Sequence, residues 1–426
     1  MVSARENELI TRTAPGTPGG ALMRRYWQPI ALSGDLPAGG APGPIRILGE
    51  DLVLFRDEAG RPGLLGINCP HRSADLSFGR IEDGGLRCLY HGWLFDIAGR
   101  CLEQPGEPAD STYKDEIRHK AYPCRELAGI IFTYMGGDDP PLFPDYEFLH
   151  VPEAHRYTTK TYIDCNYLQA LEGDIDPVHL SYLHTAVKPP DRRAVPGGAR
   201  SADFHYGNDR RPTLELELAD FGVRIYSIRA AEPGKKYVRM TNFIMPNKAA
   251  IVGNEGRINQ GNQINWHVPI DDTHHLRFDI TINRERPLDL DRYTAPIGPE
   301  VTPEGRMVRN QANRYLQDRD EMSRTFTGMG GYFMAHDSFA SESQGPIHDR
   351  TREHLGTTDK FIAAARRQIL EGIKDVENGR EPRHSIRDEA DNDLSHIVVL
   401  SEVVPNETDH RTLWKKYATE SRANGT

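Results

Sequence analysis

One short stretch limits what this chain can fold into more than any other: residues 69–91, CPHRSADLSFGRIEDGGLRCLYH. It begins with a Cys-x-His pair, Cys69 and His71, and ends with a Cys-x-x-His pair, Cys88 and His91. Two thiolates and two imidazoles on two short loops suit either a tetrahedral zinc ion or a two-iron cluster. The segment therefore predicts a metal centre of one of these two kinds.

The way the ligands are shared between the loops favours the cluster. Zinc knots usually use a Cys-x-x-Cys knuckle or a helix that carries two His, whereas each loop here offers one Cys and one His. A cluster with both thiolates on one iron and both imidazoles on the other takes one ligand for each iron from each loop. We expect Tyr90 and Trp93 to shield such a centre from water.

Composition excludes several classes of function. The 426 residues carry 62 acidic against 52 basic side chains and no Lys/Arg-rich run, so we expect no nucleic-acid partner. The N-terminus MVSARENELITR lacks the apolar core of a signal peptide, and no apolar run reaches the roughly 20 residues that span a bilayer. Five cysteines, mostly unclustered, indicate a reducing compartment. We therefore expect a cytoplasmic protein without a membrane segment.

The chain is long enough for two domains, and its texture changes along its length. We predict an N-terminal helical segment over 1–40 that packs on the catalytic domain, an all-β domain over 41–150 that carries the metal motif, and a larger α+β domain over 151–426 with a central antiparallel sheet flanked by helices. The expected helices lie at 9–31, 166–185, 302–325 and 358–378, and the expected strands of the larger domain lie at 212–283. The charged stretch 371–396 is typical of a solvated surface.

A second constellation lies in NYLQALEGDIDPVHLSYLHT, residues 166–185. Asp176 and Pro177 resemble a helix start, and the spacing of three residues puts Asp176 within hydrogen-bonding distance of His179. His184 follows five residues after His179, which is not one face of a regular helix, so the helix must end or bulge near His184 if both bind one metal; TAVKPP (185–190) is the expected terminator. Taken alone, two partly buried histidines at a helix end are the commoner explanation, and a metal site is the alternative.

Both constellations resemble a known family. The pattern C-x-H, spacer, C-x-x-H with its flanks CPHR and YHGW resembles the Rieske [2Fe-2S] domain. The second segment resembles the catalytic domain of Rieske non-haem iron oxygenases, with N-x-x-Q-x-x-E, D-x-x-H and a further His at Asn166, Gln169, Glu172, Asp176, His179 and His184. The resemblance implies that Cys69 and Cys88 hold one cluster iron and that His71 and His91 hold the other. It also implies that His179, His184 and a distant carboxylate bind mononuclear Fe(II).

The resemblance also points to the third ligand and to a route for electrons. HDSFASESQGPI matches the family's D-x4-E-x-Q pattern and makes Asp337 the expected ligand, while the nearby Asp349 and Asp359 lack that pattern. In the family, the carboxylate at the position of Asp176 bridges a cluster His of a neighbouring subunit and an iron-ligating His. This chain would therefore form a homotrimer or stacked trimers, in which electrons pass from His91 through Asp176 to His179.

Function follows from the same resemblance. The segments GTPGGALMRRYWQPIALS, LEGDIDPVHLSYLH and ESQGPIHDRTREHLGTTD are similar to the phthalate dioxygenase group, which includes aryl O-demethylases of the 5,5'-dehydrodivanillate type. The group implies a terminal oxygenase that uses O2 and electrons from a reductase or ferredoxin. We favour O-demethylation of a methoxy aromatic acid, with cis-dihydroxylation of a phthalate- or chlorobenzoate-type acid as the alternative. Arg224, Arg229 and Arg239 are the candidate carboxylate anchors.

Two functions of other classes stay open on the residues alone. The first is an electron-transfer protein with no oxygenase site of its own. The second is a zinc-stabilised binding module. A complete set of three iron ligands would have no purpose in either.

Overall fold

The computed structural model describes residues 2–185, 202–253, 260–291 and 300–423, and the chain divides into two compact units. The smaller unit comprises Thr13–Pro141 with Val268–Asp271, and the larger comprises Met1–Arg12, Leu142–His267 and Asp272–Thr426. These boundaries differ from the predicted ones at residues 40 and 150. The predicted N-terminal segment is shared, because its first helix belongs to the larger unit and the rest to the smaller.

The smaller unit is built from three antiparallel sheets. Their strand orders are β1(Gln28–Leu32)-β11(Ile130–Thr133)-β10(Cys124–Leu127), then β2(Gly43–Ile47)-β3(Glu50–Arg56)-β4(Pro62–Gly66)-β9(Ala121–Tyr122), and β5(Arg80–Glu82)-β6(Gly85–Arg87)-β7(Leu94–Phe95)-β8(Cys101–Glu103). Two short helices, α2(Pro18–Met23) and α3(Tyr113–Glu116), accompany them. Val53, Phe55, Leu65 and Phe95 form a core that also encloses the thiols of the metal motif.

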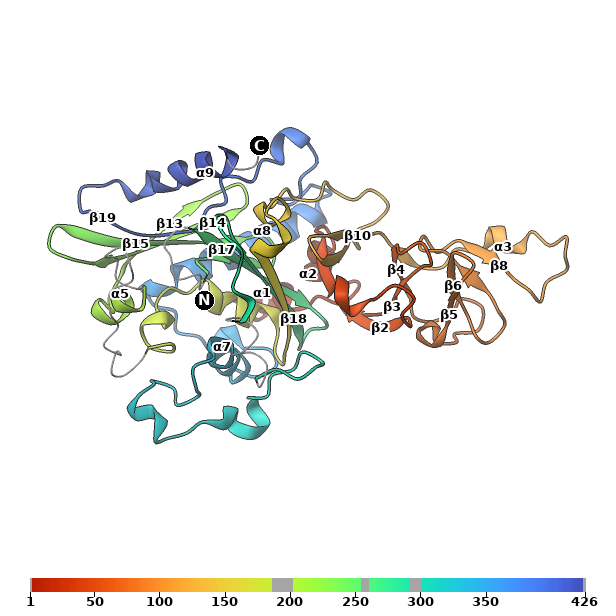
Figure 1. Cartoon of the computed structure of the whole chain (residues 1–426), viewed down its shortest axis with the longest axis horizontal. Coiled ribbons are helices and arrows are strands. Elements are labelled where there is room, and N and C mark those ends of the chain that lie inside the picture. Colours follow the sequence, from red (N-terminus) through yellow and green to blue (C-terminus); the bar gives the residue numbers. More distant parts are fainter. Residues whose placement is uncertain (1, 186–201, 254–259, 292–299, 424–426) are drawn as a thin grey trace. The chain divides into compact units, whose positions relative to one another are not determined.

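The larger unit is centred on an eight-stranded antiparallel sheet (Figure 1). Its order is β12(Arg156–Ile163)-β18(His275–Asn283)-β17(Gly261–Pro269)-β16(Lys248–Ile251)-β15(Lys235–Ile244)-β14(Gly222–Ala230)-β13(Thr213–Leu218), and β19(Leu400–Pro405) pairs with β15. The helices are α1(Ala4–Thr11), α4(Tyr167–Asp174), α5(Ala202–Asn208), α7(Phe333–Glu342), α8(Lys360–Glu377) and α9(Leu413–Ala423). An all-β unit beside a larger α+β unit confirms the predicted fold class. Among the described residues, no helix combines the length and the apolar character needed to cross a membrane.

Helices cover both faces of this sheet. On one face Tyr226, Val238 and Met240 pack against Trp414 and Tyr417 of α9. Because side chains alternate along a strand, the residues between them point to the other face, which α4 contacts at β16. Figure 1 shows α9 and α7 on opposite sides of the sheet. The face that carries α4 and α7 is the one that matters for the metal site.

The N-terminal prediction of one helix over 9–31 is wrong in its extent. Helix α1 ends at Thr11, a separate α2 covers Pro18–Met23, and Gln28 already begins strand β1. Thr17 starts α2, since its hydroxyl accepts a hydrogen bond from the Gly20 N–H at 3.1 Å and Pro18 takes the first helical position. The prolines and glycines of this stretch therefore divide it into short elements, although its apolar periodicity is typical of one helix.

The predicted helix over 302–325 is also wrong. The structure has two short 3-10 segments there, Gln311–Leu316 and Glu321–Ser323. Arg314 and Tyr315 adopt left-handed φ values of 52° and 55°, and the Asp318 carboxylate accepts hydrogen bonds from the backbone N–H groups of Asp320 and Glu321. Such local hydrogen bonds satisfy the backbone without a helical ladder. The helix expected at 358–378 is confirmed as α8, and the strands expected over 212–283 are confirmed as β13–β18.

A buried charge cluster ties α4 to α8 and to the segment after α7. The Glu172 carboxylate accepts hydrogen bonds from Arg350 Nη2 at 3.0 Å and from Arg366 Nε at 2.6 Å, and Arg366 also pairs with Glu353. Burial alone would raise the pKa of Glu172, but the two guanidinium groups outweigh it and lower that pKa. The ionised carboxylate therefore stabilises the folded state.

Glu172→Gln should reduce the free energy of unfolding by about 3–5 kcal/mol, because it leaves buried guanidinium charge without its partner. Since the folded pKa lies below the unfolded one, this contribution is present above the unfolded pKa of about 4.3 and is lost as the pH falls through the folded pKa. Urea unfolding followed by circular dichroism should show a deficit that shrinks in acid. Glu381→Gln, which removes an exposed pair with Arg387, is the control and should cost no more than about 1 kcal/mol.

Candidate metal centres

The segment that carries the two metal-type histidines is not one helix. Helix α4 ends at Asp174, and the next regular element is a 3-10 turn at His179–Ser181. Pro177 disfavours helical geometry at Asp176, and the Asp176 carboxylate accepts a hydrogen bond from the Val178 N–H at 2.7 Å, which stabilises a turn instead. The predicted helix over 166–185 therefore breaks at Ile175, earlier than expected, and Asp176 does not cap an α-helix. The expected terminator at 186–190 lies outside the described residues.

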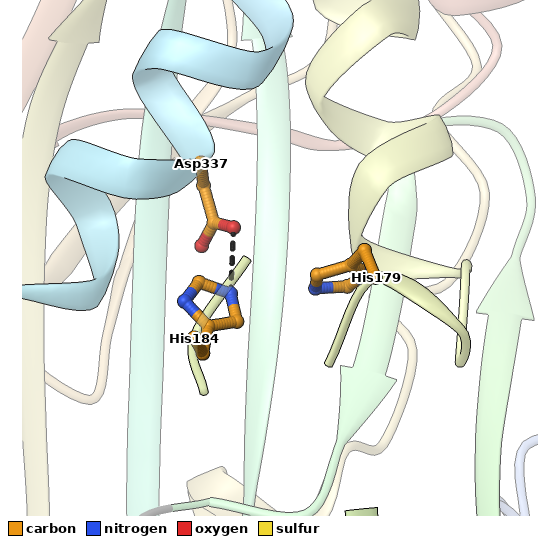
Figure 2. Close-up of side chains that lie close together, drawn as sticks. All are labelled: His179, His184 and Asp337. Atoms are coloured by element: carbon orange, nitrogen blue, oxygen red, sulfur yellow. Dashed lines mark ion pairs between the residues drawn. The ribbon is translucent and has the colours of Figure 1, made fainter. Parts of the chain in front are cut away.

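This break brings His179 and His184 beside Asp337 of helix α7. Ligand atoms of the three side chains all lie within 4.8 Å of one another, and His184 Nε2 lies 3.0 Å from Asp337 Oδ1. Figure 2 shows the carboxylate of Asp337 directed at the ring of His184, and the ring of His179 to the right of this pair. The three residues expected to bind one metal from widely separated segments thus lie together.

The donor set fits a divalent transition metal. Two ligand atoms that each lie about 2.1 Å from a metal, with a right angle between their bonds, are about 3 Å apart. His184 Nε2 and Asp337 Oδ1 have this separation. Burial lowers the pKa of His179. Burial would raise the pKa of Asp337, but the neighbouring His184 outweighs it and lowers that pKa. A neutral imidazole and an ionised carboxylate are the forms that coordinate metal. Two nitrogens and one oxygen also leave coordination positions open.

Asp176 lies close to this site but not in hydrogen-bonding contact with it. Its Oδ2 is 3.9 Å from His179 Nδ1, so the hydrogen bond expected from the spacing is not formed. Among the described residues, His179 Nδ1 has no hydrogen-bond partner although it is buried. Both side chains line a cavity of about 280 Å³ that also reaches Asp337. The Asp176 side chain is 26% exposed there, so it is accessible to a group outside the chain.

The other residues of the motif hold the segments in place. Asn166 caps α4 and donates hydrogen bonds to the carbonyls of Thr11 and Asp272. Gln169 donates to the carbonyls of Ser341 and Gly345, which joins α4 to the end of α7. Glu342 accepts from the Tyr315 hydroxyl at 2.7 Å, and Gln344 donates to the Ala340 carbonyl. Asp349 and Asp359 accept hydrogen bonds from nearby backbone N–H groups, away from the three ligands.

His336, which precedes Asp337 on α7, carries no signal in the sequence that marks it as part of the site. Its side chain is buried, and its Nδ1 lies 3.2 Å from Nδ1 of His184. No spacing rule identifies such a residue, because its partner is distant in sequence. Only the arrangement of α7 against the 3-10 turn reveals the contact.

In the smaller unit, the loop that begins at Cys69 and the loop that begins at Cys88 have the same pattern of backbone hydrogen bonds. In one, the Cys69 N–H donates to Ala74 O and the Ser73 N–H donates to Cys69 O. In the other, the Cys88 N–H donates to Trp93 O and the Gly92 N–H donates to Cys88 O. The fourth residue after each Cys has a left-handed φ, 59° at Ser73 and 74° at Gly92. The left-handed conformation can be predicted from the sequence in the second loop, where a glycine, Gly92, adopts it. It cannot be predicted in the first loop, where a serine, Ser73, does.

The loops place two buried thiols inside and two imidazoles outside. Cys69 and Cys88 are buried, and the rings of His71 and His91 lie 4.4 Å apart. Trp93 stacks on His71 at 4.5 Å as a shield, whereas Tyr90 packs on His91 but is 55% exposed. Burial, and after it the neighbouring Cys88 thiol, raises the pKa of Cys69 to about 12. Such thiols become thiolates when metal binds them, so the four residues fit a two-iron cluster.

The three candidate anchors for a carboxylate have different surroundings. Arg224 lies on the α9 face, where it pairs with Glu217 at 2.9 Å and lies over Trp414 at 4.1 Å. Arg229 lies on the opposite face and donates hydrogen bonds to Pro177 O at 2.9 Å and to Ser181 Oγ at 3.3 Å, so it supports the loop of His179.

Arg239 lies on the same face as Arg229, because it pairs across the sheet with Ser227, two residues away. Its Nη1 donates to the Tyr206 hydroxyl at 2.6 Å. Its Nε is buried and has no hydrogen-bond partner among the described residues. Of the three arginines, only this one combines a position on the metal-site face with an unused buried donor.

Two family models match the chain. The model described as Rieske [2Fe-2S] domain matches residues 26–122, and the model described as LigXa C-terminal domain like matches residues 133–425. The second match alone covers more than half of the chain.

Curated relatives match over nearly the whole length. The chain is 35% identical over 398 residues to a phthalate 4,5-dioxygenase oxygenase subunit of Pseudomonas putida, covering 89% of this chain and 88% of that protein. It is 32% identical over 421 residues to a 5,5'-dehydrodivanillate O-demethylase oxygenase subunit of a Sphingobium species, covering 96% and 88%. A dicamba monooxygenase structure shares the fold at 18% identity, with a TM-score of 0.59 and coverage of 84% and 99%.

Replacing His184 or Asp337 by Ala should abolish metal binding at the three-ligand site while the iron-sulfur absorption of the smaller unit persists, because the two sites share no ligand. Elemental analysis and the visible spectrum of the same sample measure the two effects. Asp349→Ala is the matched control and should keep both metals. If the His184 and Asp337 variants retained wild-type metal content, the ligand assignment would be wrong.

Proposed function

Because the chain belongs to the Rieske non-haem iron oxygenases, we propose that it is the terminal oxygenase for an aromatic carboxylic acid. Membership makes it an enzyme whose cofactors are a Rieske [2Fe-2S] cluster and a mononuclear iron. As the oxygenase component of such a system it receives its electrons from a reductase or ferredoxin. The substrate and the reaction are our proposal.

The observation that carries the oxygenase assignment is the convergence of His179, His184 and Asp337 at one point. When bound there, Fe(II) supplies open coordination positions at which O2 is activated. His179, His184 and Asp337 would supply three ligands and leave room at the metal for O2 and, beside it, a substrate. This arrangement speaks against an electron-transfer protein without a catalytic site, which would have no use for it.

The charge of the sheet face beside this site supports an anionic substrate. Arg229 and Arg239 are buried, and their guanidinium groups lie 4.9 Å and 5.8 Å from the ring centroid of Tyr206. Neither forms an ion pair with a described carboxylate. Two buried cations without a counter-ion are costly, and a substrate carboxylate would offset that cost. Arg229 is committed to the loop of His179, so we assign the anchoring role to Arg239.

The reaction that we propose first is O-demethylation of a lignin-type methoxy aromatic acid. Hydroxylation of the methoxy carbon gives a hemiacetal, which separates into a phenol and formaldehyde. The O-demethylase relative aligns with 96% of this chain, more than any other relative described above. The similarity of the segments around the ligands to the same group also supports this assignment.

Cis-dihydroxylation is the second candidate. It is favoured by the higher identities to oxygenase subunits of phthalate 4,5-dioxygenase (35%) and 3-chlorobenzoate-3,4-dioxygenase (34%). In this case two adjacent ring carbons rather than a methoxy carbon would lie above the metal. The ligands are the same in both reactions, so the product decides between them.

The purified protein, supplied with a reductase and a panel of methoxy and dicarboxy aromatic acids, should release formaldehyde from a methoxy acid. Replacement of Arg239 by Met should raise the KM for the methoxy acid about 10- to 100-fold, because Arg239→Met removes the charge-assisted hydrogen bond to the substrate carboxylate. Arg224→Met, the same change on the opposite face, should leave KM unchanged. A diol without formaldehyde would establish the second candidate instead, and an unchanged KM for Arg239→Met would remove that residue from the substrate site.

We propose that electrons enter through Asp176 from His91 of a neighbouring subunit, in a trimer or in stacked trimers. His91 is exposed on its loop beside Tyr90 and Leu89, which are 55% and 61% exposed. Asp176 is accessible from the cavity and lies 3.9 Å from a His179 nitrogen that has no described partner. A carboxylate between two imidazoles would accept a hydrogen bond from each of them.

Asp176→Asn should keep both metal centres but slow turnover by about 10- to 100-fold, because an amide cannot accept two such hydrogen bonds on equal terms. Single-turnover oxidation of the reduced cluster measures the step directly. Asp164→Asn, an exposed acid at the start of the same segment, serves as the control. Wild-type turnover of Asp176→Asn would remove the bridging role.

A further inference from the structure

His336 is a buried histidine that has no role in the proposed reaction as described above. It lies on α7 beside Asp337, with 4% of its surface exposed. Its Nε2 is 3.0 Å from the carbonyl oxygen of Gly330, and its Nδ1 is 3.2 Å from Nδ1 of His184. The rings of the two histidines are nearly parallel, at an interplanar angle of 22°. His336 thus lies between a backbone carbonyl and an expected metal ligand.

The chemistry of these partners determines the direction of both hydrogen bonds. A carbonyl oxygen can only accept, so Nε2 of His336 carries the proton. Nδ1 of the neutral ring is then an acceptor, and the Nδ1–H of His184 must be the donor to it. In its neutral, metal-binding form His184 then has its lone pair on Nε2, the atom that faces Asp337 Oδ1 at 3.0 Å. The Gly330 carbonyl therefore fixes which nitrogen of His184 is free to bind metal.

The Gly330 carbonyl, the first member of this series of hydrogen bonds, is held in place by its own surroundings. Gly330 has a φ of 75°, a conformation that a side chain would strain. A Cβ at this position would lie 3.2 Å from the guanidinium of Arg309. That guanidinium pairs with Glu300 at 2.9 Å and donates to the Tyr315 carbonyl. The turn that presents the Gly330 carbonyl is thus specified by contacts outside the metal site.

We propose that His336 is a positioning residue that sets the tautomer and ring orientation of His184 through a relay from Gly330 to His336 to His184. The inference rests on the proposed role of His184 as a metal ligand. It distinguishes the two histidine ligands, because His179 Nδ1 has no such partner among the described residues. The fold orients His184 before metal arrives, whereas the described residues offer no such partner to His179.

Cobalt affinity tests the relay without relying on activity. Co(II) suits the same nitrogen and oxygen ligands, and elemental analysis after equilibrium dialysis counts it separately from cluster iron. His336→Leu removes the acceptor for His184, and we expect the dissociation constant of Co(II) to rise about 10- to 100-fold. His336→Asn places an amide oxygen near the position of Nδ1, and we expect it to stay within about threefold of wild type.

The paired variants separate hydrogen bonding from packing. A packing role predicts that Leu is tolerated at least as well as Asn, which would overturn the proposal, as would equal losses in both. His336→Phe gives a second apolar variant should Leu not fold, and the cluster absorption reports folding of each sample. His384→Leu, which loses a comparable bond to the Tyr146 hydroxyl, should bind cobalt as the wild type does. Unchanged cobalt affinity in His184→Ala would refute the ligand assignment itself, whereas unchanged affinity in His336→Leu refutes only the relay.

Discussion

The metal site of the larger unit depends on the termination of α4 at Asp174. Five residues of an α-helix turn through about 500°, so His179 and His184 could not reach one metal from an unbroken helix. Pro177 and the carboxylate turn at Asp176 end the regular ladder and let the chain fold back toward α7. The metal site is therefore a consequence of helix termination.

Buried charges hold the end of α4 in place. Near that end, Glu172 binds Arg350 and Arg366. At the last residue, Asp174 accepts from His267 Nε2 at 2.8 Å and pairs with Arg277 at 3.3 Å. Both carboxylates have lowered pKa values in spite of burial, because the cations beside them outweigh the loss of water. The two pairs of Glu172 are bidentate and those of Asp174 are single directed contacts, so together they fix the position of α4 more closely than apolar packing alone would.

Much of both sites could be predicted from the sequence wherever the geometry is local. The four expected ligands of the smaller unit lie on two short loops, so their spacing alone predicts a metal centre there. The spacing of His179 and His184 alone favours two partly buried histidines, so their expected metal role rests on the family pattern. The same is true of Asp337, since no local rule joins it to residues so far away in the sequence.

The errors have physical causes as well. The i, i+5 spacing of His179 and His184 predicts a break near His184, but the effect of Pro177 on Asp176 ends helix α4 already at Asp174. The helix expected at 302–325 does not form, because side chains such as the Asp318 carboxylate accept hydrogen bonds from nearby backbone N–H groups in its place. Which face of the sheet an arginine occupies depends on strand register, which composition does not contain. The role of His336 needed the tertiary contact itself.

The balance of buried charge separates supporting residues from those that await a ligand. Arg277 has Asp174 and Asp279 beside it, and Arg366 has Glu172 and Glu353, so the fold itself compensates these cations. Arg239 is also buried, but its only hydrogen-bond partner among the described residues is the Tyr206 hydroxyl. Arg229 on the same face likewise has no described carboxylate, but hydrogen bonds to the loop of His179 occupy its guanidinium group. A substrate carboxylate beside Arg239 would offset the cost of its burial, so the charges of the described residues support our proposal of an aromatic acid over a neutral arene.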